Sequence, residues 1–431
     1  MSLQSEAVGL LQELIRANTV NPPGNETRAV EILERYLAAS GVESTRVARD
    51  PQRANLVARL RGGDGPTVLL LAHTDTVLAD AAEWRHDPWS GALVDGEVWG
   101  RGALDMKGQV AASAVAFASL AREGFRPPGD LVLALTADEE AGDGFGLEWL
   151  CEEHPDLVRC DYALNEGGGE RIVLGGAPYY VIGTAEKATA PFALRVRGRA
   201  GHASIPALAD NALVRAAGLI EAIGGYRAPR ELIPEVRTFF QLVAGTLPPA
   251  DDAAELARRV APEFAPLLEP LLSPTFSPTM IQGSGKRNVI PGLVELEVDC
   301  RLLPEQQPAD VEPLIRAALP AGNWELVWLE PAKGGTRSAA EGPLWDAIAR
   351  FLEGIEPGAR PLPVCNTGFT DSHWLRAAFG TVAYGFFPMR DMDIETTAKL
   401  IHSADERIPA SDLGLAVDGL RAAVQSLTAA A

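Results

Sequence analysis

The stretch Leu69-Leu70-Leu71-Ala72-His73-Thr74-Asp75-Thr76-Val77 is an apolar run that ends in a His-x-Asp pair. The run has the character of a buried strand, and residues two apart at a strand end point the same way. His73 and Asp75 therefore share a face, with the carboxylate in reach of one imidazole nitrogen. This pattern is typical of a metal-bound histidine whose ring a carboxylate orients. A core strand that ends in a polar turn is the structural alternative.

The length and charge of the chain restrict the classes of protein that it can represent. Its 431 residues are enough for two or three domains with their own cores, and 47% apolar and 22% charged residues are typical of globular proteins. The net charge is −20, and no run of Lys and Arg offers a basic surface. Nucleic acid and anionic membrane surfaces are therefore poor partners for this chain.

The cysteines and the N-terminus indicate the compartment. None of Cys151, Cys160, Cys300 and Cys365 forms a C-x-x-C pair, so a cysteine-rich zinc site is not expected. The stretch Met1 to Val20 lacks the basic and apolar regions of a signal peptide. No stretch is apolar over 18 residues, so no membrane span is expected. We therefore predict reduced thiols and a cytoplasmic protein.

Two kinds of element pattern divide the chain. Outside residues 185–335, helical patterns alternate with nearly continuous apolar strands, which predicts an α/β domain formed by residues 1–184 and 336–431. Inside residues 185–335 the order βα…ββαβ predicts a small two-layer α+β domain inserted in the larger one. The Pro-rich stretch 228–277 lies within this insert. It either shapes a substrate cleft or contributes only to the surface.

Four carboxylates lie just past predicted strands or at helix starts; they are Asp105, Glu139, Glu140 and Glu166. Each alone is more readily explained as a solvated loop residue. Open α/β sheets, however, place their sites at the carboxyl ends of strands, so these acids can converge on His73. A second histidine, His402, follows an apolar pair near the C-terminus.

Two histidines and three carboxylates make a site for two zinc-like cations. Two-metal sites hold their ions roughly 3.5–4 Å apart. One carboxylate must bridge the ions, and one further carboxylate must stay off the metal to take a proton from the attacking water. The Glu139-Glu140 doublet supplies one acid for each of these tasks.

The motifs LLLAHTDTV, GRGALDMKG, ADEE, LNEGGG, RAGHAS, KRNVIPG and LIHSADE occur in this order and cover nearly the full length. Each motif alone is weak, but their combination resembles the M20 metallopeptidase family. Members of that family include aminoacylases, acetylornithine deacetylase and succinyl-diaminopimelate desuccinylase. The resemblance implies a mixed-sheet, di-zinc catalytic domain. It also implies that the insert is a ferredoxin-like lid and dimerisation domain.

The resemblance assigns roles to the ligand-type residues. It implies that Asp105 bridges the two ions, that His73 and Glu166 cap one of them, and that Glu140 and His402 cap the other. It also implies a cis peptide bond after Asp105.

The remaining catalytic roles rest on the same resemblance. It makes Glu139 the general base and Asp75 the residue that orients His73. A glutamate at Glu166 favours the aminoacylase and deacylase members over several true peptidases.

Five residues resemble the substrate-facing groups of the family: His202, Asn288, Arg301, Gly368 and Thr370. A histidine N–H can stabilise an oxyanion, and an arginine fork suits a substrate carboxylate. For Arg301 an ordinary surface ion pair is an equally good explanation. The loop 366–371 departs from the Gly-Gly-Thr-type motif of many relatives, because Phe369 lies inside it.

We therefore predict a hydrolase that uses two divalent ions, zinc first and cobalt as a second choice, to cleave the amide of an N-acyl amino acid or similar compound. A dipeptidase or carboxypeptidase on the same scaffold is the alternative within this chemistry. A non-catalytic metal-binding relative is the alternative outside it. We also expect a homodimer in which His202 serves the partner's site.

Overall fold

The computed structural model describes residues 2–262 and 264–428, and the chain forms two compact units. The first unit comprises residues 1–184, 338–364 and 370–431, and the second comprises residues 185–337 and 365–369. The short segment 365–369 therefore groups with the second unit, which the sequence patterns did not indicate. Within the described residues, no helix combines the length and the apolar character that crossing a bilayer requires.

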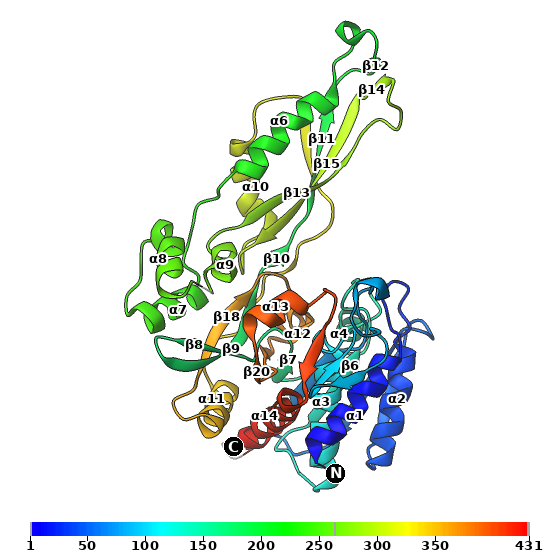
Figure 1. Cartoon of the computed structure of the whole chain (residues 1–431), viewed down its shortest axis with the longest axis vertical. Helices are drawn as coiled ribbons and strands as arrows, with labels where there is room; N and C mark the ends of the chain where they lie inside the picture. The colour runs from blue at the N-terminus through cyan, green and yellow to red at the C-terminus, as the bar shows by residue number, and fades with distance from the viewer. Residues whose placement is uncertain (1, 263, 429–431) are drawn as a thin grey trace. The chain divides into compact units, whose positions relative to one another are not determined.

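The first unit is built on a ten-stranded mixed sheet (Figure 1). Its strand order is β1-β2-β6-β3-β7-β19-β9-β8-β20, and β18 also pairs with β9. The central strands β6, β3, β7 and β19 are mutually parallel, and antiparallel pairs flank them. This confirms the predicted mixed α/β fold. The strands are β1 (Ser44–Ala48), β2 (Ala54–Leu60), β3 (Val68–His73), β6 (Leu131–Thr136), β7 (Tyr162–Asn165), β8 (Glu170–Leu174), β9 (Ala177–Glu186), β18 (Arg360–Asn366), β19 (Val382–Gly385) and β20 (Met389–Asp393).

The apolar run of β3 is continuous because both of its faces are buried. Leu70 and Ala72 belong to one hydrophobic core, and Leu69 and Leu71 belong to another. Helices supply the other side of each core, and α1, α3 and α14 pack on one another (Figure 1). The first core is covered by α1 (Leu3–Arg16), α2 (Thr27–Ala39), α3 (Lys107–Arg122), α11 (Pro343–Ile355) and α14 (Ala410–Thr428), and the second by α4 (Leu147–Glu153), α5 (Pro155–Val158) and α12 (Ser372–Phe379).

A small three-stranded sheet joins two segments that are far apart in the sequence. Its order is β21-β5-β4, with β4 at Ala92–Val94, β5 at Glu97–Trp99 and β21 at Arg407–Pro409. The antiparallel pairing of β5 with β21 places the chain around residue 100 beside the chain around residue 406. Both segments lead directly to ligand-type residues of the candidate site.

The second unit is a twisted sheet with two helices on one face. The sheet has the order β16-β11-β15-β10-β17, and β13 pairs with the free edge of β15. Its side chains alternate between buried and less buried along β15, as expected for a sheet with one buried face. The elements are β10 (Ala188–Thr189), β11 (Phe192–Arg197), α6 (Ala212–Gly225), β13 (Thr275–Gln282), β15 (Leu293–Leu302), α10 (Pro308–Ala318), β16 (Trp324–Trp328) and β17 (Lys333–Gly334).

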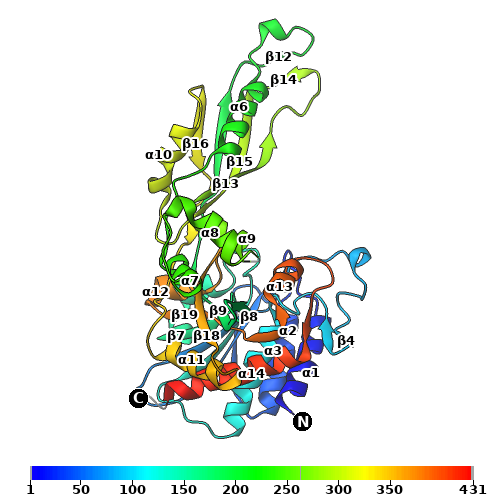
Figure 2. The same ribbon diagram turned by 60° about the vertical axis from the view of Figure 1, so that its left-hand side comes forward.

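The Pro-rich part of the second unit forms a separate group of helices. Figure 2 shows α7 (Pro234–Ala244), α8 (Ala253–Val260) and α9 (Ala265–Leu268) gathered together. Phe239 of α7 stacks on Phe264 with ring centroids 5.1 Å apart. Lys187, a buried lysine, ties this group to β10 by donating to the carbonyl oxygens of Pro270 at 2.8 Å and Ser273 at 3.0 Å.

Candidate metal centre

Three neighbouring strands of the first unit end at the same edge of the sheet. The parallel register pairs Val68 of β3 with Leu131 of β6 and with Tyr162 of β7. His73 is the last residue of β3, the Glu139-Glu140 doublet follows β6, and Glu166 follows β7. Strand ends in an open sheet therefore bring these groups together, as the sequence predicted.

Asp105 lies between the two candidate histidines. Its Oδ1 is 3.3 Å from Nε2 of His73, and its Oδ2 is 2.9 Å from Nε2 of His402. The two oxygens of one carboxylate thus face different imidazoles, which is the arrangement that a bridging ligand needs. The peptide bond between Asp105 and Met106 is cis, as the sequence resemblance implies.

The three glutamates surround this pair of histidines. Oε1 of Glu166 lies 3.7 Å and Oε2 of Glu139 lies 3.9 Å from Nε2 of His73. Oε2 of Glu140 lies 3.3 Å from Nε2 of His402. His73 with Glu139 and Glu166 forms one group of atoms close enough to hold an ion, and His73 with Asp105 and Glu140 forms another.

Asp75 is buried and fixes two parts of the site at once. Nδ1 of His73 lies 3.1 Å from the carbonyl oxygen of Asp75 and 3.3 Å from its Oδ1, which leaves Nε2 directed at the acidic cluster. The carboxylate also accepts hydrogen bonds from the N–H of Glu139 at 3.2 Å and of Glu140 at 3.1 Å. The side chain of Asn21 donates to it at 3.0 Å. Asp75 therefore orients both the imidazole and the backbone of the doublet.

Burial and the nearby charges shift the pKa values of the clustered side chains. Burial, together with the charge of Glu166, raises the pKa of Glu139 well above its usual range. Burial, partly offset by His73, likewise raises the pKa of Glu166. Burial alone would lower the pKa of His73, but the surrounding carboxylates raise it. Hydrogen bonds with Asp105 and then Glu140 raise the pKa of His402 to about 10. Burial dominates the shifts of the two glutamates, and neighbouring carboxylates raise the pKa values of both histidines.

Unsatisfied buried atoms support the same conclusion. Among the described residues, Nε2 of His73 and Oε1 of Glu140 are buried without a hydrogen-bond partner. Buried polar atoms are usually paired, and a cation between the acids and the histidine is a partner that would satisfy both of these atoms. Imidazole nitrogen and carboxylate oxygen are donors that suit zinc and related divalent ions. The residues present therefore fit a pair of such cations.

Two of the predicted substrate-facing residues meet at one end of the second unit. β12 (Gly201–His202) pairs with β14 (Val289–Ile290), so His202 lies opposite Val289 and next to Asn288. The N–H of Ala203 donates to the carbonyl oxygen of Asn288 at 3.0 Å. The sequence predicted these two residues separately, and the structure places them beside each other at one two-stranded sheet.

Arg301 and Gly368 meet at the other end of the same unit. A Cβ atom added to Gly368 would lie 4.0 Å from Nη1 of Arg301. Asp299 binds the opposite edge of the guanidinium through Nε and Nη2, at 2.9 and 3.0 Å. The ion pair that competed with the functional interpretation is thus present, and it leaves Nη1 turned toward the loop.

Thr370 belongs to the first unit, whereas Gly368, two residues earlier, belongs to the second. Its hydroxyl accepts hydrogen bonds from the side chain of Asn165 at 3.2 Å and from the N–H of Ser372 at 3.2 Å. Its neighbour Asp371 is buried and accepts from the hydroxyl of Thr136 at 3.0 Å. Burial raises the pKa of Asp371 to about 7.

Sequence reasoning missed two residues that shape the site. Asn21 bridges Asp75 and the neighbouring Asp138, donating to them at 3.0 and 3.1 Å. Glu406 accepts the N–H of Asp105 at 2.9 Å. The only signal for Glu406 was its place in the LIHSADE motif, and a loop of Asn and Pro gave none for Asn21.

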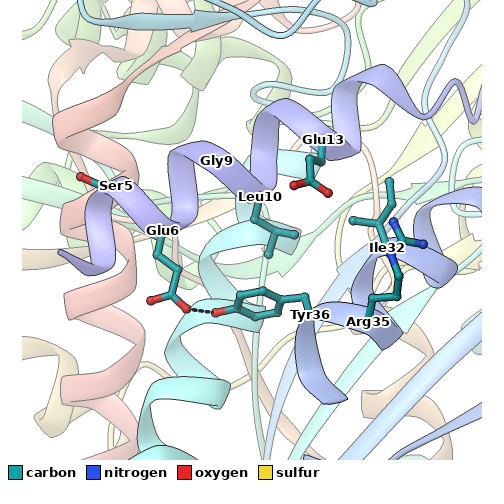
Figure 3. A pocket seen from close by; sticks show the side chains of 8 residues that line it. All are labelled: Ser5, Glu6, Gly9, Leu10, Glu13, Ile32, Arg35 and Tyr36. Atoms are coloured by element: carbon teal, nitrogen blue, oxygen red, sulfur yellow. Dashed lines mark hydrogen bonds between the residues drawn. The ribbon is translucent and has the colours of Figure 1, made fainter. Parts of the chain in front are cut away.

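A groove in the first unit lies apart from these residues. It measures about 430 Å³ and runs between α1 and α2, as Figure 3 shows. The hydroxyl of Tyr36 donates to Glu6 across it at 2.6 Å. None of the predicted ligands lines it, so it is not part of the metal centre.

Comparison with known proteins identifies the family. A family model described as peptidase family M20/M25/M40 matches residues 69–426. A protein of Cereibacter sphaeroides named succinyl-diaminopimelate desuccinylase is 30% identical over 417 residues, covering 94% of each chain. One of the same name from Methylobacterium nodulans is 30% identical over 423 residues, covering 94% of this chain and 92% of its own.

Solved structures share the fold at lower identity. An M20 family metallo-carboxypeptidase from Sulfolobus solfataricus superposes with a TM-score of 0.75 at 19% identity, covering 98% of this chain and 99% of its own. The dipeptidase Dug1p from Saccharomyces cerevisiae gives 0.69 at 15% identity, covering 99% and 96%. The family match covers most of the chain and includes every candidate ligand. The chain therefore belongs to peptidase family M20/M25/M40.

Proposed function

We propose that the chain is a metal-dependent hydrolase that cleaves the amide bond of N-acyl amino acids or related small compounds. The observation that carries this proposal is Asp105, whose two oxygens face His73 and His402 separately. The desuccinylase name of relatives that match over nearly the whole chain favours removal of an acyl group from an amino acid.

The cations are two divalent ions per chain, zinc first and cobalt as a second choice. Asp105 is the shared ligand, with His73 and Glu166 completing one set and Glu140 and His402 the other. When bound, the ions polarise the scissile carbonyl and lower the pKa of water. The N and O donors of these side chains suit zinc, and none of the proposed ligands is a cysteine.

Glu139 is the residue that moves the proton. Its Oε2 lies beside Nε2 of His73 at 3.9 Å, and burial, together with the charge of Glu166, raises its pKa. A base with such a pKa can take a proton from water and return it to the leaving amine. Asp75 keeps its backbone in place, as it does for Glu140.

His202 is suited to stabilise the oxyanion that forms on the carbonyl oxygen. The N–H of Ser204 donates to Nδ1 of His202 at 3.2 Å, so Nδ1 acts as an acceptor. In the neutral ring the proton is then on Nε2, which becomes a hydrogen-bond donor. The side chain is exposed, and it is available to a substrate.

The proposed substrate contacts are Arg301, Gly368, Thr370 and Asn288. Nη1 of Arg301 and the backbone near Gly368 lie close enough to bind one carboxylate group between them. Thr370 extends the same loop. Asn288 lies with His202 at the other end of the unit.

The second unit is proposed as a ferredoxin-like lid and dimerisation domain. Arg301 lies near one end of β15 and His202 lies beyond its other end. The strand from Leu293 to Arg301 spans roughly 26 Å at the usual rise per residue. One small substrate cannot touch both residues of the same copy, so a site that uses both must draw them from two copies.

The surface of the second unit supports a homodimer. Leu213 and Val214 on α6, and Met280 and Ile281 on the edge strand β13, are exposed apolar residues. Edge strands and apolar patches of this kind favour association.

The four free cysteines suit a cytoplasmic location.

A substrate panel tests the reaction. Zinc- and cobalt-loaded protein is offered N-acetyl, N-succinyl and long-chain N-acyl amino acids together with dipeptides. We expect hydrolysis of an N-acyl amino acid, loss of turnover after chelation, and recovery when metal returns. Faster turnover of dipeptides would instead establish the peptidase alternative. Full turnover by rigorously metal-free protein would overturn the proposal.

A further inference from the structure

Glu406 is a fully buried carboxylate that binds four donors from one loop. Its Oε1 accepts hydrogen bonds from the N–H groups of Leu104 at 2.7 Å and Asp105 at 2.9 Å. Its Oε2 accepts the N–H of Gly102 at 3.1 Å and Nη1 of Arg101 at 2.5 Å. Two carboxylate oxygens have about four lone-pair sites, so these donors occupy the group and leave no capacity for a cation.

Arg101 also binds the segment that follows His402. Its Nη2 donates to the carbonyl oxygen of Ser403, the next residue, at 3.0 Å. The N–H of Gly100 donates to the carbonyl oxygen of Glu406 at 3.0 Å. The guanidinium is buried beside the ring of Trp84, and Cζ of Arg101 lies 5.3 Å from the ring centroid. Side chain and backbone therefore join the two segments at several points.

These contacts determine the spacing of two proposed ligands. Asp105 lies in the loop that Glu406 binds, and His402 lies four residues before Glu406. About three hundred residues separate the loops in sequence, and Nε2 of His402 nevertheless lies 2.9 Å from Oδ2 of Asp105. The pairing of β5 with β21 brings the two segments together, and the Arg101–Glu406 pair contacts both loops directly beside the two ligands.

We infer that Glu406, together with Arg101, is a positioning residue that holds Asp105 and His402 at the separation needed to share one divalent ion. The inference rests on the proposed metal roles of Asp105 and His402. A glutamine at position 406 would turn an NH2 group toward N–H donors, so it would lose at least one of these hydrogen bonds. Mutation of a residue that orients metal ligands typically weakens metal binding by about 10–100-fold.

The experiment compares Glu406→Gln with wild type in full-length apo protein. Calorimetry with zinc, and the visible spectrum during cobalt addition, measure the affinity of each of the two ions without substrate. We expect the ion that depends on His402 to bind about 10–100-fold more weakly. We expect a smaller loss for the ion at His73 and Glu166, which shares only Asp105 with the disturbed loop.

Glu97→Gln is the matched control. Glu97 pairs with Nε of Arg407 at 3.0 Å between β5 and β21, so this variant removes an arginine–carboxylate pair from the same small sheet. It should leave both affinities unchanged. Glu406→Asp keeps the charge and shortens the reach, and it provides a second variant if Glu406→Gln does not fold.

The outcomes separate this inference from the proposed function. Wild-type affinity for both ions in a folded Glu406 variant would overturn the inference and leave the proposed reaction standing. Wild type that binds two ions but hydrolyses nothing would overturn the reaction alone, and the affinity comparison would still decide the role of Glu406. Wild type that binds fewer than two ions would overturn both.

Discussion

Glu139 and Glu140 are neighbours in sequence whose carboxylates face different groups. Oε2 of Glu140 lies 3.3 Å from His402, whereas Oε2 of Glu139 lies near His73 at 3.9 Å. The preceding residue, Asp138, has a φ of 68°, in the left-handed region. Such a backbone turn separates the two side chains, and Asp75 holds both N–H groups in that arrangement.

The doublet leads to a prediction about two substitutions. Glu139→Gln should keep both ions and lose roughly 10²–10⁴-fold in turnover, because proton transfer is removed while the ligands stay. Glu140→Ala should lose one ion, because a ligand is removed. Metal analysis of dialysed protein and turnover at fixed metal measure the two effects. If Glu139→Gln strips metal and Glu140→Ala retains it, the two roles are reversed.

The residues of the site differ in how far sequence could predict them. His73 and Glu166 were predictable because ligand-type residues stand directly after apolar strand runs. Asn21 and Glu406 act through hydrogen bonds to partners that are distant in sequence, 54 residues away for Asn21 and Asp75 and 301 for Glu406 and Asp105. No periodic pattern marks such a contact, so only the fold reveals it.

At the scale of elements, burial decided which strands were predictable. β3 and β6 are buried on both faces and stand out as apolar runs. The side chains of β1 are mostly exposed, so its sequence carries no apolar pattern. β9 runs across the boundary at residue 185 that the sequence patterns predicted, and it contains Gly183. In the structure Gly183 pairs with Gly385, where two backbones approach closely.

The helical group of the second unit gives a prediction about stability. Lys187 is buried, donates to carbonyl oxygens of Pro270 and Ser273, and binds Asn366 through its own N–H at 2.9 Å. Lys187→Met should leave those carbonyls unsatisfied and lower the free energy of unfolding by about 1–3 kcal/mol. The amide of Glu231, which donates to Leu272 at 2.8 Å, should exchange hydrogen faster.

Hydrogen exchange and denaturant unfolding measure these effects. Lys399→Met is the control, because Lys399 is exposed and pairs only along its own helix α13 (Ile394–Leu400), with Glu395. The control should leave the exchange of the Glu231 amide unchanged. Unchanged exchange in Lys187→Met would mean that the helices are anchored by other contacts.

At the scale of the whole molecule, the second unit sets a geometric limit on the site. His202 and Arg301 lie at opposite ends of this unit, separated by roughly 26 Å of strand. Sequence motifs predicted both residues, but motifs give no distance between them. A site that uses both residues would have to draw them from two copies of the chain, which agrees with the expected homodimer.

The final prediction tests this requirement by complementation. His202→Ala and Glu139→Ala are each expected to be inactive as homodimers, the first for lack of the oxyanion donor and the second for lack of the base. Mixed under conditions that allow subunit exchange, they form heterodimers. In a symmetric dimer the exchange of residues is reciprocal. One site then combines an intact Glu139 with the partner's intact His202, so about half of the wild-type activity per heterodimer should return. Exchange verified by mass spectrometry of the native complexes, with no return of activity, would show that His202 acts within its own chain or not at all.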